Sequence, residues 1–330
     1  MIPTATFTRR MLAMAACAGA ALASVCAPAH AQWPAAGKPV RIIVGFPAGG
    51  GADVLARAIQ QPLSEKLGTP VIVENRPGAG GMTGTDYVAK SAPDGYTVYM
   101  ATPGAFTIWP NLRKLPYDPV KDFAAVSLLV TMPNLLVVSP NAPFKDVRSI
   151  IAAAKAPGSK VDFASGGIAT LDHIMGEQFN MLAGINMNHV AYKGTAPKVT
   201  DVMAGVVPIT FADPSTKPMI ESGKLRMLAV TTKKRSRLFP DTPTMEEAGV
   251  PGYEAMNWYG IVAPAASPAE AVQKMNAALV EIMARPEMRK RMEGVGMEAT
   301  SSTPAEFNKL IAGERDRWGA LVVKAGIKAE

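Results

Sequence analysis

An α/β fold is predicted by two features of the sequence: short strand-like runs alternate with helical stripes, and glycine-rich turns join them. Residues 40–44 form one β-branched run, and apolar residues at helical spacing follow from Asp53 to Leu67. This alternation is typical of a parallel sheet covered by helices. The chain has 330 residues, of which 48% are hydrophobic and 18% charged. That is enough for two globular domains and unlike a disordered protein.

Further elements follow in the same order along the chain. We expect Gly68 to end the first helix and Pro62 to kink it. Two later helices each begin at a Ser/Thr-Pro-Ala-Glu sequence, residues 267–270 and 303–306, which predicts a capping box with proline in the first turn. The other expected elements are strands at 71–73, 96–100, 135–138 and 161–164, and helices at 147–155 and 171–182.

Residues 1–31 have the layout of a secretory signal peptide. Arg9-Arg10 precedes an apolar run over 11–23, and Ala-His-Ala at 29–31 supplies a cleavage site. The run is too short to span a bilayer of about 30 Å as a helix. We therefore expect cleavage at that point and export to the periplasm. The paired arginines also allow a twin-arginine route, and Cys17 a lipoprotein site.

The remaining chain excludes several kinds of chemistry. It has no cysteine and keeps two histidines, His173 and His189, so we expect no disulfide, no thiolate nucleophile and no metal site. Gly51 stands where a phosphate loop needs lysine, and Val54 where a dinucleotide motif needs glycine. We therefore expect no cofactor. The formal charge of the full chain is +7, but its basic clusters are short, so no nucleic-acid partner is expected.

Two strand–glycine loop–helix units, Val44–Asp53 and Ala164–His173, are the candidate binding site. Glycine lets backbone N–H groups approach a ligand closely, and the following helix presents its unpaired N–H groups and positive dipole end. Such a combination binds anions without arginine. A carboxylate held between the two loops is therefore one interpretation. The other is that each loop only turns a strand into its helix.

Individual side chains near the loops also allow two interpretations. Asp53 could bind a ligand or satisfy first-turn N–H groups, and His173 could donate to a carboxylate or pack as a neutral imidazole. Lys193 could attract an anion or simply be solvated. Trp109 and Trp258 could lie at a cleft, where an aromatic ligand would stack, or in the core.

Six blocks of sequence resemble one known family. They are GFPAGGGADVLAR (45–57), PVIVENRPGAGG (70–81), APDGYTVYM (92–100), AYKGTAP (191–197), GKLRMLAVTTKKRS (223–236) and FPDTPTMEEAGVPGYE (239–254). In this order they resemble the Bug family, the extracytoplasmic solute receptors of tripartite tricarboxylate transporters. The resemblance implies a bilobal periplasmic binding protein of the Venus-flytrap kind (type II), with two α/β domains joined by two crossover strands. Lobe one would be 32–130 plus 256–330, and lobe two 131–255.

The resemblance also implies a site and a function. A ligand carboxylate would be gripped between the two glycine loops, largely through backbone groups and ordered waters. The protein would capture a carboxylate or dicarboxylate and deliver it to the membrane subunits of the transporter as a monomer, without catalysing a reaction. The alternative is a ligand sensor that feeds a signalling partner. Asp213 follows from the resemblance with an offset of one residue. The expected ligand-binding residues are Phe46, Pro47, Ala48, Gly49, Gly50, Gly51, Ala52, Asp53, Ser165, Gly166, Gly167, Ile168, Ala169, Thr170, His173, Lys193 and Asp213.

Overall fold

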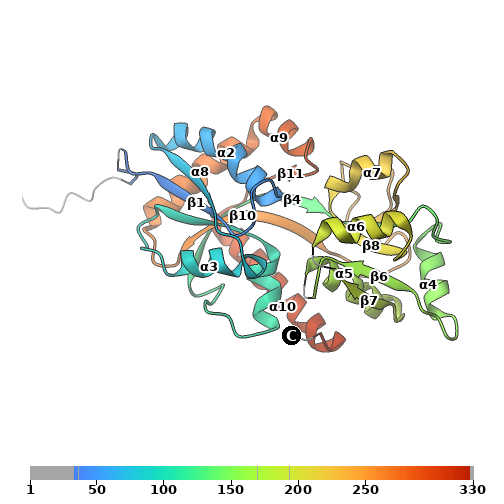
Figure 1. Cartoon of the computed structure of the whole chain (residues 1–330). Coiled ribbons are helices and arrows are strands. Elements are labelled where there is room, and N and C mark those ends of the chain that lie inside the picture. Colours follow the sequence, from blue (N-terminus) through green and yellow to red (C-terminus); the bar gives the residue numbers. More distant parts are fainter. Residues whose placement is uncertain (1–32, 36, 169, 193, 328–330) are drawn as a thin grey trace, which may run out of the picture. The chain divides into compact units, whose positions relative to one another are not determined.

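The computed structural model describes residues 33–35, 37–168, 170–192 and 194–327 (Figure 1). The two sheets of the protein belong to one compact unit of the chain. The predicted signal peptide lies outside the described residues. Within those residues, no helix has the length and apolar character needed to cross a membrane.

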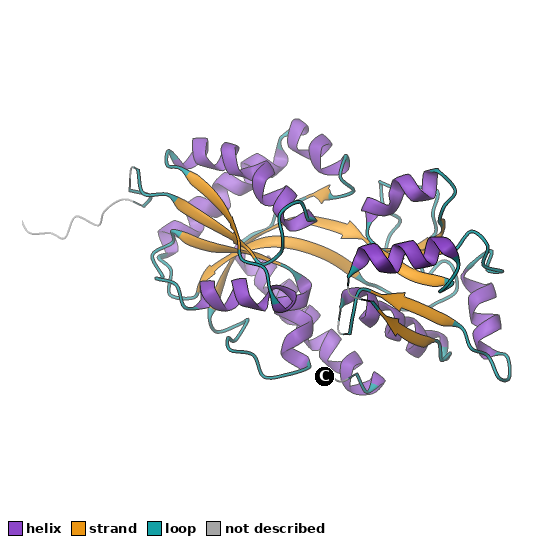
Figure 2. Cartoon of the chain, in the orientation of Figure 1, coloured by secondary structure: helices purple, strands orange, loops and turns teal. Residues whose placement is uncertain are grey.

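The first sheet has the strand order β11-β4-β10-β3-β1-β2 (Figure 2). β1 (Val40–Val44) is parallel to β2 (Val71–Asn75) and β3 (Thr97–Ala101), which confirms the strands predicted there. β10 (Met256–Pro264) is antiparallel to β3 and to β4 (Phe123–Pro133), and β11 (Glu298–Ala299) is antiparallel to β4. The expectation of a parallel sheet is therefore wrong for β4, β10 and β11, whose pairings are all antiparallel. The reason for β10 is that the chain returns from the second sheet and enters the first from the opposite end.

The second sheet has the order β7-β6-β8-β5-β9. β6 (Asp162–Ser165) is parallel to β7 (Asn188–Ala191) and β8 (Ile209–Ala212). β5 (Leu135–Val138) is antiparallel to β8 and to β9 (Arg226–Val230). Only Asn134 separates β4 of the first sheet from β5 of the second, so the chain passes between the sheets at this residue and returns before β10.

Helices pack around both sheets. In Figure 1, α2 and α8 lie above the first sheet and α3 and α10 below it. The helices are α2 (Gly51–Leu67), α3 (Met82–Ala89), α4 (Val147–Lys155), α5 (Leu171–Ala183), α6 (Thr195–Ala204), α7 (Lys217–Glu221), α8 (Ala269–Ala284), α9 (Pro286–Glu293) and α10 (Pro304–Ala325), with short turns η1 (Ala79–Gly81), η2 (Gly104–Ile108), η3 (Trp109–Asn111) and η4 (Pro214–Thr216).

The helix signals in the sequence are confirmed in part. Thr303 caps α10 as predicted, because its hydroxyl accepts from the Glu306 N–H at 3.2 Å while the Glu306 carboxylate accepts from the Thr303 N–H at 2.9 Å. The capping box predicted at 267–270 is wrong: α8 begins one residue later than the pattern requires, with Pro268 at its N-cap and no side-chain cap. Pro62 lies inside α2, which continues through it to Leu67 and ends at Gly68 with φ 65°.

α10 belongs to the hydrophobic cores of both sheets. Phe307 and Ile311, near its start, pack with the first core, whereas Trp318 and Leu321 pack with residues of the second sheet. Between these two halves lies the buried Glu314, whose carboxylate accepts from the indole N–H groups of Trp258 and Trp318 at 3.1 and 3.3 Å. α10 thus joins the two cores, in addition to the two crossovers of the chain.

Candidate functional site

A cavity of about 760 Å³ lies at the carboxyl ends of strands from both sheets. Phe46 follows β1, Thr102 follows β3 and Asn134 follows β4, while Gly166 follows β6 and Asp213 follows β8. In α/β proteins, ligands bind outside the carboxyl ends of the strands. The lining comprises Phe46, Pro47, Ala48, Gly50, Gly51, Ala52, Gly80, Thr102, Pro103, Gly104, Trp109, Asn134, Gly166, Thr170, Leu171, Asp172, Gly194, Thr195, Lys198, Phe211, Asp213, Asn257 and Tyr259.

The first glycine loop is held in place by Asp53. This side chain is buried, and it accepts from the Gly49 N–H, the Arg57 Nε and the Asn75 Nδ2, each at 2.9 Å. Asn75 also donates to the Phe46 carbonyl at 3.1 Å. Burial opposes ionisation, but Arg57 and the other hydrogen bonds hold the pKa of Asp53 below its usual value. Asp53 does not line the cavity, and its hydrogen bonds anchor the loop.

Asp172 and Lys198 anchor the second glycine loop. The Asp172 carboxylate accepts from the Gly166 N–H at 2.7 Å and from the Lys198 ammonium at 2.5 Å, and Lys198 also donates to the Phe211 carbonyl at 2.8 Å. Burial favours the neutral acid, yet the charge of Lys198 keeps the pKa of Asp172 below its usual value. Sequence reasoning missed both residues. Asp172 in the first turn of a helix was a usable signal, whereas Lys198 lies far away in the chain.

The two histidines form a stack behind the second loop. The rings of His173 and His189 lie 3.7 Å apart and nearly parallel, and Phe163 stacks on His189. Burial, followed by the neighbouring charge of His189, lowers the pKa of His173 to about 4, and burial also lowers the pKa of His189. The His189 Nε2 is 2.5 Å from the Ser165 hydroxyl. His173 is therefore a packed, neutral imidazole that does not line the cavity.

The structure brings together about half of the predicted site residues. Phe46, Pro47, Ala48, Gly50, Gly51, Ala52, Gly166, Thr170 and Asp213 line the cavity, while Gly49, Asp53, Ser165, Gly167, Ile168 and His173 do not. Ala169 and Lys193 lie outside the described residues. Asp213 caps η4, since its carboxylate accepts from the Ser215 N–H at 2.8 Å. Of the two tryptophans considered, Trp109 lines the cavity, whereas Trp258 is buried against Phe307.

Helix N-termini supply the positive character of this cavity. The first residues of α2, α5 and α6 all line it, and none of these helices has a side-chain cap. The N–H groups of a first helical turn have no partner inside the helix. Lys198 is the one cationic side chain in the described lining, and Asp172 already neutralises it. An anion in the cavity would thus be bound mainly by backbone N–H groups and helix dipoles.

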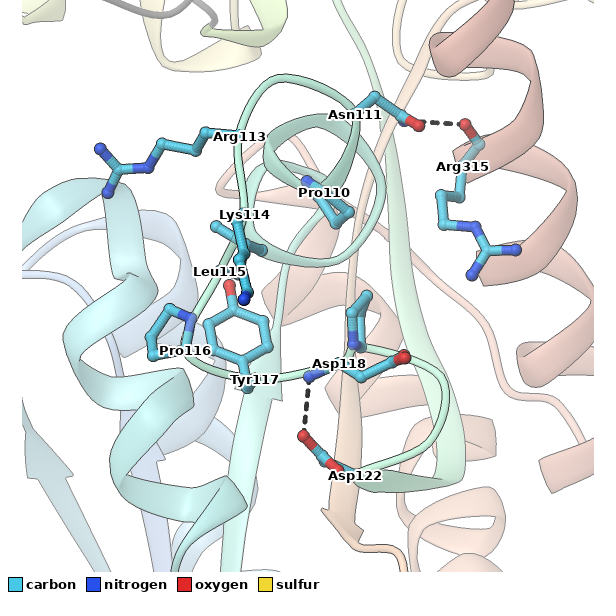
Figure 3. Close-up of a pocket in the computed structure, with 11 residues that line it drawn as sticks. Pro110, Asn111, Arg113, Lys114, Leu115, Pro116, Tyr117, Asp118, Asp122 and Arg315 are labelled. Atoms are coloured by element: carbon cyan, nitrogen blue, oxygen red, sulfur yellow. Dashed lines mark hydrogen bonds between the residues drawn. The ribbon is translucent and has the colours of Figure 1, made fainter.

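A second hollow of about 570 Å³ lies on the surface beside η3 (Figure 3). Asn111 donates to the Arg315 carbonyl at 2.9 Å, and the Asp118 N–H donates to the Asp122 carboxylate at 2.7 Å. The described lining of this hollow contains no buried side-chain polar atom without a partner. The cavity between the sheets, in contrast, contains two: Thr102 Oγ1 and Asn134 Nδ2. Unpaired buried polar atoms therefore mark the described lining of the cavity but not that of the hollow.

Comparison with known proteins identifies the family. The sequence profile described as the tripartite tricarboxylate transporter family receptor matches residues 55–327. The chain belongs to this receptor family. It is also similar to Protein BugT of Bordetella pertussis, with 34% identity over 315 residues that cover 93% of this chain and 95% of that protein. The predicted resemblance to Bug receptors is thereby confirmed.

Solved structures of receptors in this family share the fold. A Rhodopseudomonas palustris protein determined with adipate is 34% identical with a TM-score of 0.79, covering 90% of this chain and 99% of that one. MatC of the same species, with bound malate, is 30% identical with a TM-score of 0.75 over 86% and 98% of the two chains. The periplasmic binding protein BugD is 33% identical with a TM-score of 0.75 over 88% and 99%. The predicted bilobal α/β fold is confirmed, and these relatives are solute-binding receptors, not enzymes.

Proposed function

We propose that this receptor captures a carboxylate or dicarboxylate in the cavity and delivers it to the membrane subunits of a tripartite tricarboxylate transporter. The observation that carries the proposal is the convergence of the N-termini of α2, α5 and α6 on one cavity. The first belongs to the helices of the first sheet, and the other two pack with the second. An anion bound by both groups would hold two lobes together, here assigned to 32–130 with 256–330 and to 131–255.

The arrangement suits binding without chemistry. Backbone N–H groups recognise the shape and charge of a carboxylate, yet they neither accept nor release its protons. Asp53 and Asp172 fix the loops that present these groups. Phe46 to Ala52 and Ser165 to Thr170 are the proposed clamp, and Lys193 and Asp213 are further proposed ligand-binding residues. Two related structures were determined with adipate and with malate, which supports a small dicarboxylate for this chain.

The proposal includes the cellular setting. Residues 1–31 are proposed to direct export to the periplasm and to be removed, by the general or the twin-arginine route, and the mature protein is proposed to act as a monomer. Delivery to a transporter predicts that its membrane subunits capture the receptor in a ligand-dependent way. Ligand-dependent capture of a sensor kinase alone would contradict delivery and favour the sensing alternative.

Backbone recognition can be tested with a pair of variants at one residue. Thr195 is the first residue of α6 and lines the cavity. Thr195→Pro removes its N–H at a position where proline is accepted in a helix, whereas Thr195→Ala keeps the N–H. We expect Thr195→Pro to weaken dicarboxylate binding roughly tenfold or more, as expected for a hydrogen bond to a charged group. Thr195→Ala should bind much like the unaltered protein.

The measurement is calorimetric titration with succinate, malate, glutarate, adipate and citrate, after a thermal-shift screen. A ligand at about 1,000 times its dissociation constant stabilises by roughly 4 kcal/mol. Sugars and neutral amino acids serve as controls. Failure of every acid to bind protein that has been unfolded and refolded to release any retained ligand would overturn the proposed function. Equal affinities of the Thr195→Pro and Thr195→Ala variants would exclude the Thr195 N–H from the clamp.

A further inference from the structure

Asn134 is a buried residue whose side-chain amide nitrogen, Nδ2, has no hydrogen-bond partner among the described residues. It is 5% exposed and lines the cavity, and its Nδ2 makes no hydrogen bond with any described residue. Its backbone, in contrast, is fixed on both sides: the Asn134 N–H donates to the Thr231 hydroxyl and the Asn134 carbonyl accepts from the Thr231 N–H, each at 2.9 Å. The carboxamide is thus held at the cavity wall by a rigid backbone.

A buried carboxamide N–H₂ without an acceptor is costly. It has two donors that lose their hydrogen bonds to water, and the loss is recovered when a ligand supplies an oxygen. Buried polar groups are rarely left unpaired in folded proteins, so those that are unpaired point to an absent partner. Asn134 is therefore placed to donate to an oxygen atom of the ligand.

The position of Asn134 indicates which part of the ligand it meets. It is the single residue between β4 of the first sheet and β5 of the second, so it lies at the crossover between the two groups of helix N-termini. Those N-termini provide the donors for carboxylates at the ends of a ligand. A ligand that spans from one group to the other would present the middle of its carbon chain to the crossover.

A second buried polar atom without a partner, on another wall of the cavity, supports this assignment. Thr102 directly follows β3, is 5% exposed and has a hydroxyl without a partner among the described residues. The pairing of Gly260 with Ala101 places Thr102 beside Tyr259, several residues along β10 from the position of Asn134. The cavity lining therefore includes two separate unpaired polar groups, Thr102 and Asn134, among apolar side chains such as Trp109 and Phe211.

We propose that Asn134 selects dicarboxylates that carry a hydroxyl or oxo oxygen on the chain between the two carboxylates. This inference rests on the proposed function, since it assumes that helix N-termini bind the carboxylates. A saturated dicarboxylate of the same length fills the cavity but leaves the Asn134 donors unpaired. Sites built to hydrogen-bond a ligand oxygen discriminate against analogues that lack it for this reason.

The test compares matched acids by calorimetric titration of the protein purified from the periplasm. The pairs are malate with succinate, and 2-hydroxyglutarate and 2-oxoglutarate with glutarate. We expect the oxygenated member of at least one pair to bind roughly tenfold to a hundredfold more tightly. Asn134→Leu, which keeps the volume and removes the donors, should abolish that preference by weakening the oxygenated acid alone. Thermal unfolding of the variant verifies that it folds, and Asn134→Ser provides a second, smaller substitution.

Other outcomes overturn the inference in distinguishable ways. Equal affinities within every pair would show that the site does not recognise the hydroxyl or oxo oxygen between the two carboxylates. Equal weakening of both members by Asn134→Leu would show that Asn134 binds a carboxylate instead. Tighter binding of aspartate than of malate would refute a donor role, because an ammonium group cannot accept a hydrogen bond. If no acid binds at all, the proposed function fails as well.

Discussion

Replacing Lys198 by methionine should strongly destabilise the protein and loosen its second glycine loop. The Lys198 side chain is 3% exposed and that of Asp172 is 15% exposed, with 2.5 Å between ammonium and carboxylate. Methionine keeps most of the apolar stem but removes the charge. Asp172 then stays buried without its charged partner while it still accepts from the Gly166 N–H, and the Phe211 carbonyl loses its hydrogen bond from Lys198.

The expected loss of stability follows from the burial of the Lys198–Asp172 pair. Removing one partner of a buried ion pair costs about 3–5 kcal/mol, because the other charge stays behind without compensation. At about 2–4 °C per kcal/mol for a domain of 150–250 residues, the melting temperature should fall by roughly 6–20 °C. Lys198→Met combined with Asp172→Asn should regain much of this loss, since no charge is then buried alone.

Thermal unfolding and urea titration measure the effect, and calorimetry measures dicarboxylate affinity in parallel. Lys217→Met is the matched control, because Lys217 is 53% exposed and its contact with Glu221 is 3.8 Å long. An exposed pair of this kind contributes at most about 1 kcal/mol. A melting temperature of Lys198→Met close to that of the unaltered protein would refute the reasoning. So would a double variant no more stable than the single one.

Three further predictions concern the loops, the histidine stack and the sheet. Asp53→Asn should weaken dicarboxylate binding severalfold and lower the free energy of unfolding by about 1–3 kcal/mol, because Arg57 loses its buried charged partner. Unchanged affinity in calorimetric titration would show that the Gly49 loop does not need this anchor. The folded pKa of His173, about 4, lies below the usual 6.5, so the unfolded chain binds the extra proton. The free energy of unfolding should therefore fall as pH drops from about 6.5 towards 4, by up to roughly 3 kcal/mol; denaturant titrations of His173→Gln should show a flatter profile, and an identical profile would contradict this origin. Gly260→Ala should lower the free energy of unfolding by about 1–3 kcal/mol, since its Cβ would lie 2.4 Å from Phe307. Gly313→Ala, with open space around the new methyl group inside α10, should raise it by about 0.5–1 kcal/mol. Thermal unfolding measures both variants, and equal melting temperatures would refute the packing argument.

Local features of the molecule could be predicted from the sequence because they depend on neighbouring residues. The strands at 40–44 and 135–138, the end of α2 at Gly68 and the capping box of α10 follow from periodicity, a left-handed glycine and a short capping pattern. Both glycine loops were predicted for the same reason, since a strand, glycines and a helix start are adjacent in the chain. The failed capping box at 267–270 marks the limit of such patterns, because the tertiary structure begins α8 after Pro268.

Long-range features were decided only by the tertiary structure. Asp53 is buried and bonded to Asn75 at the end of β2, in addition to Arg57 one turn further along α2. His173 packs on His189 because β6 and β7 are neighbours. Lys198 and Asn134 had no sequence signal, since the importance of each depends on burial and on partners far away in the chain. The sequence by itself therefore determined the elements and the two glycine loops, whereas the folding of both sheets around one cavity decided which side chains can meet a ligand.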